Sequence, residues 1–209
     1  QGDVITLKFH ADAGDINNSS RDDMNFYIDD LKIIGTSITS SVFHTIKTPL
    51  TISRSTINIP VQVAGENSPV DADTSQFLSI VTTQDNSPID LVNSTVRNSA
   101  NDGVKTSGAN SGISLLNCMV ENHIQGVTTE GIGSNIDVYG SHILNNGLHG
   151  ILTETLNSDV SVEYSFINSN GTWWPASGCG IQANNNCEVD VRYSHADVYV
   201  LPLIEYEAP

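Results

Sequence analysis

Lys105, Glu130 and Glu154 are the residues of this sequence whose types and spacing could do chemistry together. The lysine stands two residues after a glycine, and each glutamate stands four residues after an equivalent glycine. A lysine can abstract a proton as a general base, and two neighbouring carboxylates can hold Ca²⁺, which prefers oxygen ligands. His149, directly before the glycine of its own segment, is a fourth candidate. The competing interpretation is that both glutamates are solvated on an outer face.

The segments that carry these residues repeat along the chain. Each begins with an aliphatic anchor and has a small residue five positions later. The anchors are Leu31, Leu50, Val70, Ile89, Ile113, Ile136, Val160 and Val189. In the four clearest repeats the small residues are Ser94, Cys118, Ser141 and Ser165. Because apolar and polar residues alternate within each segment, the pattern predicts short strands joined by turns rather than helices.

Stacked segments would share one core and repeat the same side-chain neighbours on every rung. Strands about 4.8 Å apart would satisfy each other's backbone groups and bury one continuous apolar interior. Asn98, Asn122 and Asn145 stand nine residues after their anchors, so we predict a stacked asparagine ladder in which each amide bonds the next. The same stacking would place the lysine and the two glutamates on one outer face.

This pattern of anchors, small residues and asparagines resembles the right-handed parallel β-helix repeat of the pectin-lyase-like superfamily. The resemblance implies an all-β fold: a right-handed parallel β-helix of about eight rungs over residues 31–198. An N-terminal strand segment, residues 1–30, would cap one end, and an apolar C-terminal tail, residues 199–209, would follow the other. The superfamily includes pectate lyases, polysaccharide epimerases, glycoside hydrolases, phage tailspikes and surface proteins. It therefore implies an extracellular or cell-surface location and contact with carbohydrate.

Charge and composition limit the partners. The 209 residues carry a formal net charge of −16, which repels nucleic acid and anionic membranes and favours cations. The sequence has no apolar run long enough to span a bilayer. An outward column one residue after the anchors alternates Asp with Ser, for example Asp90, Ser114 and Asp137, and this alternation separates like charges.

Two further segments are candidates for ligand binding. The acidic stretch 12–23 is a possible calcium loop, and the alternative is a solvated loop; its acidic residues are Asp12, Asp15, Asp22 and Asp23. Trp173 and Trp174 stand in an insertion flanked by Gly and Pro, where they could stack on sugar rings or cover a rung edge. No cofactor other than Ca²⁺ is indicated.

Cysteine spacing predicts one crosslink. Cys179 and Cys187 are eight positions apart beside the insertion, and a disulfide between them would close a short loop in an oxidising compartment. Cys118 occupies the small-residue column, so we expect it to be a packed thiol.

Three functions remain open at this point. The first is a structural or adhesive β-helix in a surface assembly such as an appendage, sheath, surface layer or spike. Its apolar tail would contact other copies or other assembly proteins by strand addition. The second is a carbohydrate-binding module that uses Trp173 and Trp174. The third is a polysaccharide lyase or epimerase acting on a uronate-containing glycan, in which Lys105 removes a proton while Glu130 and Glu154 bind Ca²⁺. The sequence favours the first.

Overall fold

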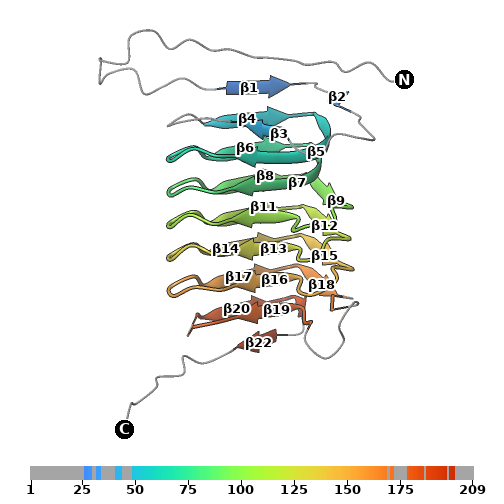
Figure 1. The fold of residues 1–209 in the computed structure, drawn as a ribbon. Coiled ribbons are helices and arrows are strands. Elements are labelled where there is room, and N and C mark those ends of the chain that lie inside the picture. The colour runs from blue at the N-terminus through green and yellow to red at the C-terminus, as the bar shows by residue number, and fades with distance from the viewer. Residues whose placement is uncertain are drawn as a thin grey trace.

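The chain forms a stack of parallel strands. The computed structural model describes residues 26–29, 32–33, 41–43, 49–168, 170–171, 178–185, 187–196 and 198–200. The strands build two sheets, one of eight strands and one of 14, and all pairings within these residues join neighbouring rungs in parallel (Figure 1). No helix occurs in the described ranges. The all-β architecture and the number of rungs agree with the repeats in the sequence.

The first sheet contains the anchor strand of each rung. Because apolar side chains alternate with polar ones along these strands, one face turns to the core and the other to solvent. Its strands are β1 (Phe26–Asp29), β4 (Leu50–Ser53), β6 (Val70–Asp73), β8 (Ile89–Val92), β11 (Ile113–Leu116), β14 (Ile136–Tyr139), β17 (Val160–Glu163) and β20 (Val189–Arg192).

In its N-terminal rungs the second sheet includes two long strands, and from β9 onward each rung contributes two short strands to it. These short strands form two rows, called the β9 row and the β10 row. The N-terminal rungs contain β2 (Lys32–Ile33), β3 (Ser41–Phe43), β5 (Thr56–Val63) and β7 (Gln76–Thr82). The β9 row consists of β9 (Thr95–Arg97), β12 (Met119–Glu121), β15 (His142–Leu144), β18 (Phe166–Asn168) and β21 (His195–Ala196). The β10 row consists of β10 (Val104–Thr106), β13 (Val127–Thr129), β16 (Ile151–Thr153), β19 (Ile181–Ala183) and β22 (Val198–Val200).

The first and last strands of the β-helix differ from those that the sequence predicted. Phe26, not Leu31, lies opposite Leu50 at the start of the first rung, because β1 pairs with β4 from that residue. The helix therefore begins inside the segment expected to be a cap. At the other end β22 pairs with β19, with Val198 opposite Ile181, so the first residues of the expected tail add a strand. An apolar strand can continue the sheet wherever the last rung leaves an open edge.

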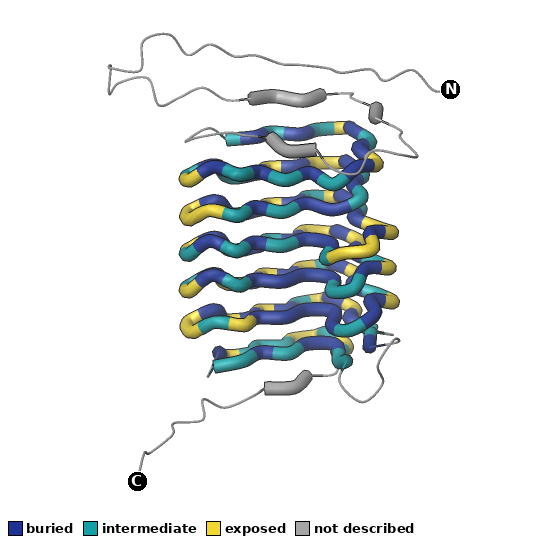
Figure 2. Tube along the Cα trace, viewed as in Figure 1, coloured by how far each residue is buried: buried dark blue, intermediate teal, exposed yellow. Residues whose placement is uncertain are grey.

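The anchors form the core as expected. From Leu50 to Val189 they are opposite one another in register, and Ile89, Ile113 and Ile136 are buried on successive rungs (Figure 2). Each fully buried Ile or Leu contributes about 1.5–3 kcal/mol relative to an exposed one. Repetition of this burial on every rung makes the interior one continuous apolar column.

Buried serines join the rungs at the turn that follows each anchor strand. The backbone N–H of Cys118 donates to Oγ of Ser141 at 2.9 Å, and the N–H of Ser141 donates to Oγ of Ser165 at 3.0 Å. The N–H of Ser75 donates in the same way to Oγ of Ser94 at 3.1 Å. This confirms the stacked small-residue column. Each hydroxyl satisfies an N–H that the turn removes from the sheet ladder.

A second serine column, which the repeat analysis did not identify, lies at the turn before the anchors. Its N–H to Oγ hydrogen bonds are 2.9–3.1 Å long and connect Ser68, Ser87, Ser111, Ser134 and Ser158. The signal was present in the sequence, because each of these serines stands two residues before its anchor.

The asparagine ladder, which lies at a left-handed turn, is confirmed as a side-chain hydrogen bond only between its first two members. Asn98, Asn122 and Asn145 have φ values of 66°, 62° and 54°, a region in which Asn is enriched among residues other than Gly. Nδ2 of Asn122 donates to Oδ1 of Asn98 at 3.1 Å. The backbone N–H of Asn122 donates to the carbonyl of Leu144, directly before Asn145, which continues the stack.

Candidate functional site

The outer face of the β10 row brings the predicted chemical residues together. Lys105 lies opposite Thr128 in the parallel register of β10 and β13, between inward-facing neighbours that are buried. Glu130 follows β13 directly, and Glu154 follows β16 in the equivalent place one rung further. The prediction that these three residues share one face is therefore confirmed.

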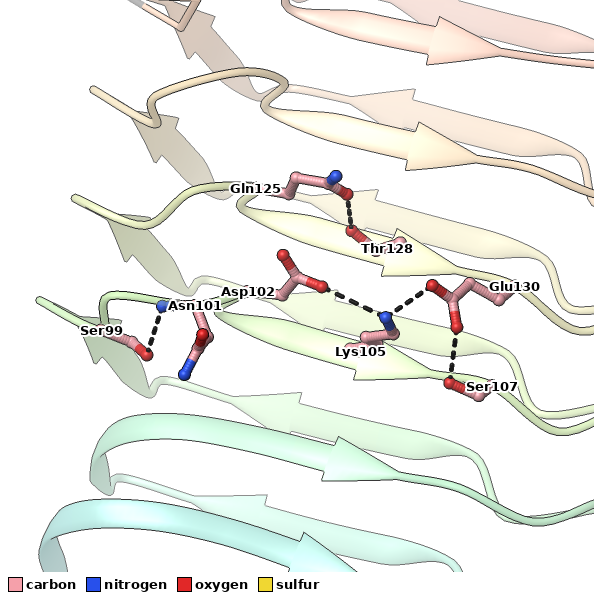
Figure 3. Close-up of polar contacts among 8 residues, drawn as sticks. All are labelled: Ser99, Asn101, Asp102, Lys105, Ser107, Gln125, Thr128 and Glu130. Atoms are coloured by element: carbon pink, nitrogen blue, oxygen red, sulfur yellow. Dashed lines mark hydrogen bonds and ion pairs between the residues drawn. The ribbon is translucent and has the colours of Figure 1, made fainter. Parts of the chain in front are cut away.

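Lys105 is the centre of an ion-pair network (Figure 3). Its Nζ lies 2.5 Å from Oε1 of Glu130 and 3.4 Å from Oδ2 of Asp102. Ser107 donates a hydrogen bond of 2.8 Å to the other oxygen of Glu130. Asp102 was not among the predicted site residues, although it stands three residues before Lys105 and directly before the rung glycine.

The network keeps Lys105 charged. Partial burial disfavours the ammonium, but the hydrogen bond and charge of Glu130, together with the charge of Asp102, outweigh it and raise the pKa of Lys105. For Glu130 the cost of burial is likewise outweighed, because hydrogen bonds from Lys105 and Ser107 lower the pKa of its carboxyl. A general base works best with a pKa near the operating pH, so this lysine is poorly placed to accept a proton.

Glu154 differs from Glu130 in its surroundings. Partial burial, and then the negative charge of Glu130, raise the pKa of its carboxyl, whereas Lys105 lowers it. The side chain is exposed one rung beyond the ion pair. Within the described ranges, no cluster of three or more His, Cys, Asp or Glu side chains could hold a metal ion. Both carboxylate oxygens of Glu130 already have partners, because Oε1 pairs with the ammonium of Lys105 and Oε2 accepts the hydrogen bond of Ser107.

His149 belongs to a different part of this face. It stands two residues before β16, whereas Glu154 follows that strand directly, so four residues separate the two along the strand direction. Its Nδ1 lies 3.4 Å from Sγ of Cys179 on the next rung. Burial lowers the pKa of His149, which favours the neutral imidazole. The four residues proposed for catalysis therefore do not form one constellation.

The disulfide predicted between Cys179 and Cys187 is wrong. The two cysteines flank β19, and neither is in a disulfide. Sγ of Cys187 donates to the carbonyl oxygen of Thr155 at 2.9 Å, while Cys179 lies beside His149. An extended strand rises about 3.3 Å per residue, so the strand between them carries the two thiols beyond bonding distance.

Acidic residues line the outer face of the first sheet. Asp71 and Asp90 are directly opposite on neighbouring rungs, although the rungs after Asp90 alternate Asp with Ser as expected. Burial, and then the charges of Asp71 and Asp137, raise the pKa of Asp90. Asp71, Asp73 and Asp90 line a shallow depression over β4, β6 and β8.

Several predicted binding residues lie outside the described residues. These are the acidic residues of the possible calcium loop and the two tryptophans of the insertion, namely Asp12, Asp15, Asp22, Asp23, Trp173 and Trp174. They remain predictions.

A buried polar column beside the asparagine ladder was missed. Oδ1 of Asn170 accepts the N–H of Asn146 at 3.0 Å, Oδ1 of Asn146 accepts the N–H of His123 at 3.0 Å, and Nδ1 of His123 accepts the N–H of Ser99 at 3.3 Å. Each residue stands ten positions after its anchor. Because the residue types differ from rung to rung, the column could be found only by position.

These features define the class of the protein as a parallel β-helix whose polar columns mainly join its rungs. The sequence matches the family described as right-handed beta helix region over residues 70–198, which is more than half of the chain. The chain therefore belongs to the right-handed β-helix family, as the repeats indicated. No curated protein and no solved structure matches it. In the part of the chain that the structure describes, no helix is long and apolar enough to cross a membrane.

Proposed function

We propose that the chain is an extracellular structural or adhesive β-helix that serves as a subunit of a surface assembly. The observation that carries this proposal is the state of Lys105, whose ammonium is held by Glu130 and Asp102. The side chains that best suited proton abstraction instead neutralise one another across two rungs. A regular stack of this kind gives a stiff rod with long outer faces, which suits a scaffold.

The assembly can be tested on the whole chain. We expect electron microscopy and multi-angle light scattering to show oligomers or filaments whose size grows with protein concentration. Removal of residues 201–209 should reduce this growth if the C-terminal tail makes the contacts by strand addition. A strict monomer at high concentration, with or without the tail, would contradict the proposal.

A polysaccharide lyase or epimerase is the second candidate. Lys105 and the two glutamates share one outer face, which is the placement that such a reaction would use. The test is incubation with pectate, alginate and related uronans in the presence of Ca²⁺, with ultraviolet absorbance to detect unsaturated products and proton exchange at C5 to detect epimerisation. Activity that disappears in Lys105→Ala would establish the enzyme and displace the scaffold proposal.

Glycan binding without catalysis would fit the scaffold role. A glycan array with the intact chain tests this, with Trp173→Ala and Trp174→Ala as the variants expected to lose binding. Aromatic side chains supply large apolar contact areas, and this is the reason for choosing them.

A further inference from the structure

Exposed apolar side chains gather at one corner of the helix, where the first sheet turns into the β9 row. Three neighbouring columns meet at this corner (Figure 1). The first ends the strands of the first sheet, the second forms the turn, and the third begins the strands of the β9 row. We call this surface the aromatic ridge; its apolar residues are Leu116, Met119, Tyr139, Tyr164, Phe166 and Tyr193. Among the large hydrophobic side chains that are exposed in the described residues, only Ile132 and Leu156 lie elsewhere.

The rings of the ridge hold one another in place. Tyr164 and Tyr193 are stacked, with centroids 5.0 Å apart and planes 9° apart, and Tyr139 meets Tyr164 edge-on at 5.4 Å. In the neighbouring column Phe166 stacks on His195 at 5.2 Å. Rings that are already ordered lose little conformational entropy when a partner covers them, so the ridge is preorganised for binding.

The backbone does not require tyrosine at this corner. Tyr164 and Tyr193 have φ values of 49° and 50°, a region that is unfavourable for bulky residues. Earlier rungs fill the same turn with residues of several sizes, namely Arg54, Thr74, Asn93, Asn117 and Gly140. The turn therefore does not need an aromatic residue, and two exposed tyrosines that stack on neighbouring rungs indicate that the rings themselves are used.

Charge around the ridge restricts the partner. Glu163 lies opposite Tyr139 in the strand register, and Asp137 is two residues from that tyrosine on the same face of β14. The nearby guanidinium of Arg192 is held by Asp190 at 2.6 Å. A second copy with its own net charge of −16 would bring like charges together, whereas a partner with basic side chains would meet carboxylates.

Ring geometry also bears on the kind of partner. The stacked faces of Tyr164 and Tyr193 cover each other, so a sugar ring cannot pack between these two rings. The exposed ring edges can contact aromatic and aliphatic side chains, which pair favourably edge to face. Tyr, Phe and Met are enriched at protein interfaces for this reason.

We propose that the aromatic ridge is a docking surface for a polypeptide that carries Lys or Arg beside aromatic or aliphatic side chains. The inference rests on the proposed scaffold role, because it supplies the surface on which such a scaffold holds another protein. The apolar side chains of the partner cover the ring edges, and its cations lie against Glu163 and Asp137.

The test is selection of phage-displayed dodecapeptides on the whole chain, followed by fluorescence anisotropy with the most enriched peptide. The ridge variant is Tyr164→Asn with Tyr193→Asn. It should fold, because Asn tolerates the positive φ of these two positions. The matched control is Ile132→Asn with Leu156→Asn, which removes the two large, exposed hydrophobic side chains that lie outside the ridge among the described residues. We expect the enriched peptides to combine basic with aromatic residues, to bind the ridge variant at least tenfold more weakly, and to bind the control unchanged.

Three results would overturn the proposal. One is a failure to enrich peptides, or enrichment of peptides that bind wild type and the ridge variant equally. Another is loss of glycan-array binding in the ridge variant without any peptide binding. The third is a change in the oligomeric state of the pure protein on mutating the ridge, which would make a second copy the occupant. Peptide binding is measured on protein that is not assembled, so its result does not depend on the assembly test. Failure of the docking proposal and failure of the scaffold proposal can therefore be told apart.

Discussion

Two buried hydroxyls on the inside of the helix should respond to removal in opposite directions. Ser141 and Thr129 are both fully buried. Oγ of Ser141 accepts the backbone N–H of Cys118 at 2.9 Å and donates to the carbonyl of Tyr139 at 2.9 Å. Oγ1 of Thr129 has no hydrogen-bond partner, like those of Thr106 and Thr153 on the neighbouring rungs.

The expected free energies follow from these partners. Ser141→Ala leaves the N–H of Cys118 buried without an acceptor, a cost of about 1–3 kcal/mol. The carbonyl of Tyr139 still accepts a hydrogen bond of 3.0 Å from the N–H of Asn117. The destabilisation therefore comes mainly from the N–H of Cys118, which loses its acceptor. Thr129→Val keeps the shape of the side chain and removes a hydroxyl that is desolvated without compensation, so it should stabilise the fold by about 1 kcal/mol.

Urea denaturation followed by far-ultraviolet circular dichroism measures both changes. At constant m-value the midpoint should fall for Ser141→Ala and rise for Thr129→Val. In thermal melts a loss of about 2 kcal/mol corresponds to about 4–8 °C for a chain of this size. Ser161→Ala, at an exposed outward position of β17, is the control and should change stability by less than about 0.5 kcal/mol.

A shift of the urea midpoint in the same direction for both variants would contradict this prediction. A loss of stability in Ser141→Ala no larger than that of the exposed control would contradict it as well. Either outcome would mean that the serine columns do not supply the acceptors that the turn N–H groups need.

Four other perturbations test separate features. Nε2 of His123 lies 3.1 Å from the carbonyl of Val96 and burial lowers the pKa of this histidine, so the unfolded chain binds the proton first as the pH falls; stability should be complete above about pH 6.5 and fall below it, and the slope of melting temperature against pH should become smaller in His123→Asn, where His149 still contributes to it. Gly131→Ala would place Cβ 1.8 Å from a backbone oxygen of the previous rung, so we expect a loss of several kcal/mol or no folded protein by circular dichroism. Asn122→Ala should cost about 1 kcal/mol by urea titration, and Asn122→Gly less, because Gly tolerates the left-handed turn. Lys105→Met should raise the pKa of the Glu130 carboxyl from its lowered value, which a carboxyl ¹³C NMR titration would detect; an unchanged titration would contradict the ion pair.

The candidate site could be predicted in part. That Lys105 and the two glutamates share a face followed from their distances to the rung glycines, because parallel stacking converts equal offsets into vertical neighbours. The ion pair with Asp102 could not be predicted, because it depends on side-chain rotamers and on which carboxylate the ammonium reaches. For the same reason the lysine was assigned as a base, although its neighbours keep it charged.

Sequence alone determined the fold and its uniform columns. Each rung places equivalent residues in the same environment, so selection for one environment repeats one residue type at a constant offset, as in the serine column of Ser141 and Ser165. Only the tertiary structure decided the mixed column, in which the N–H of Ser99 donates to Nδ1 of His123 and the N–H of His123 donates to Oδ1 of Asn146. It also decided that Phe26 begins the first rung and that β19 separates Cys179 from Cys187. These features depend on which side chains and backbone groups are close in space. The sequence shows such a contact only where neighbouring rungs have the same residue type at the same offset from the anchor.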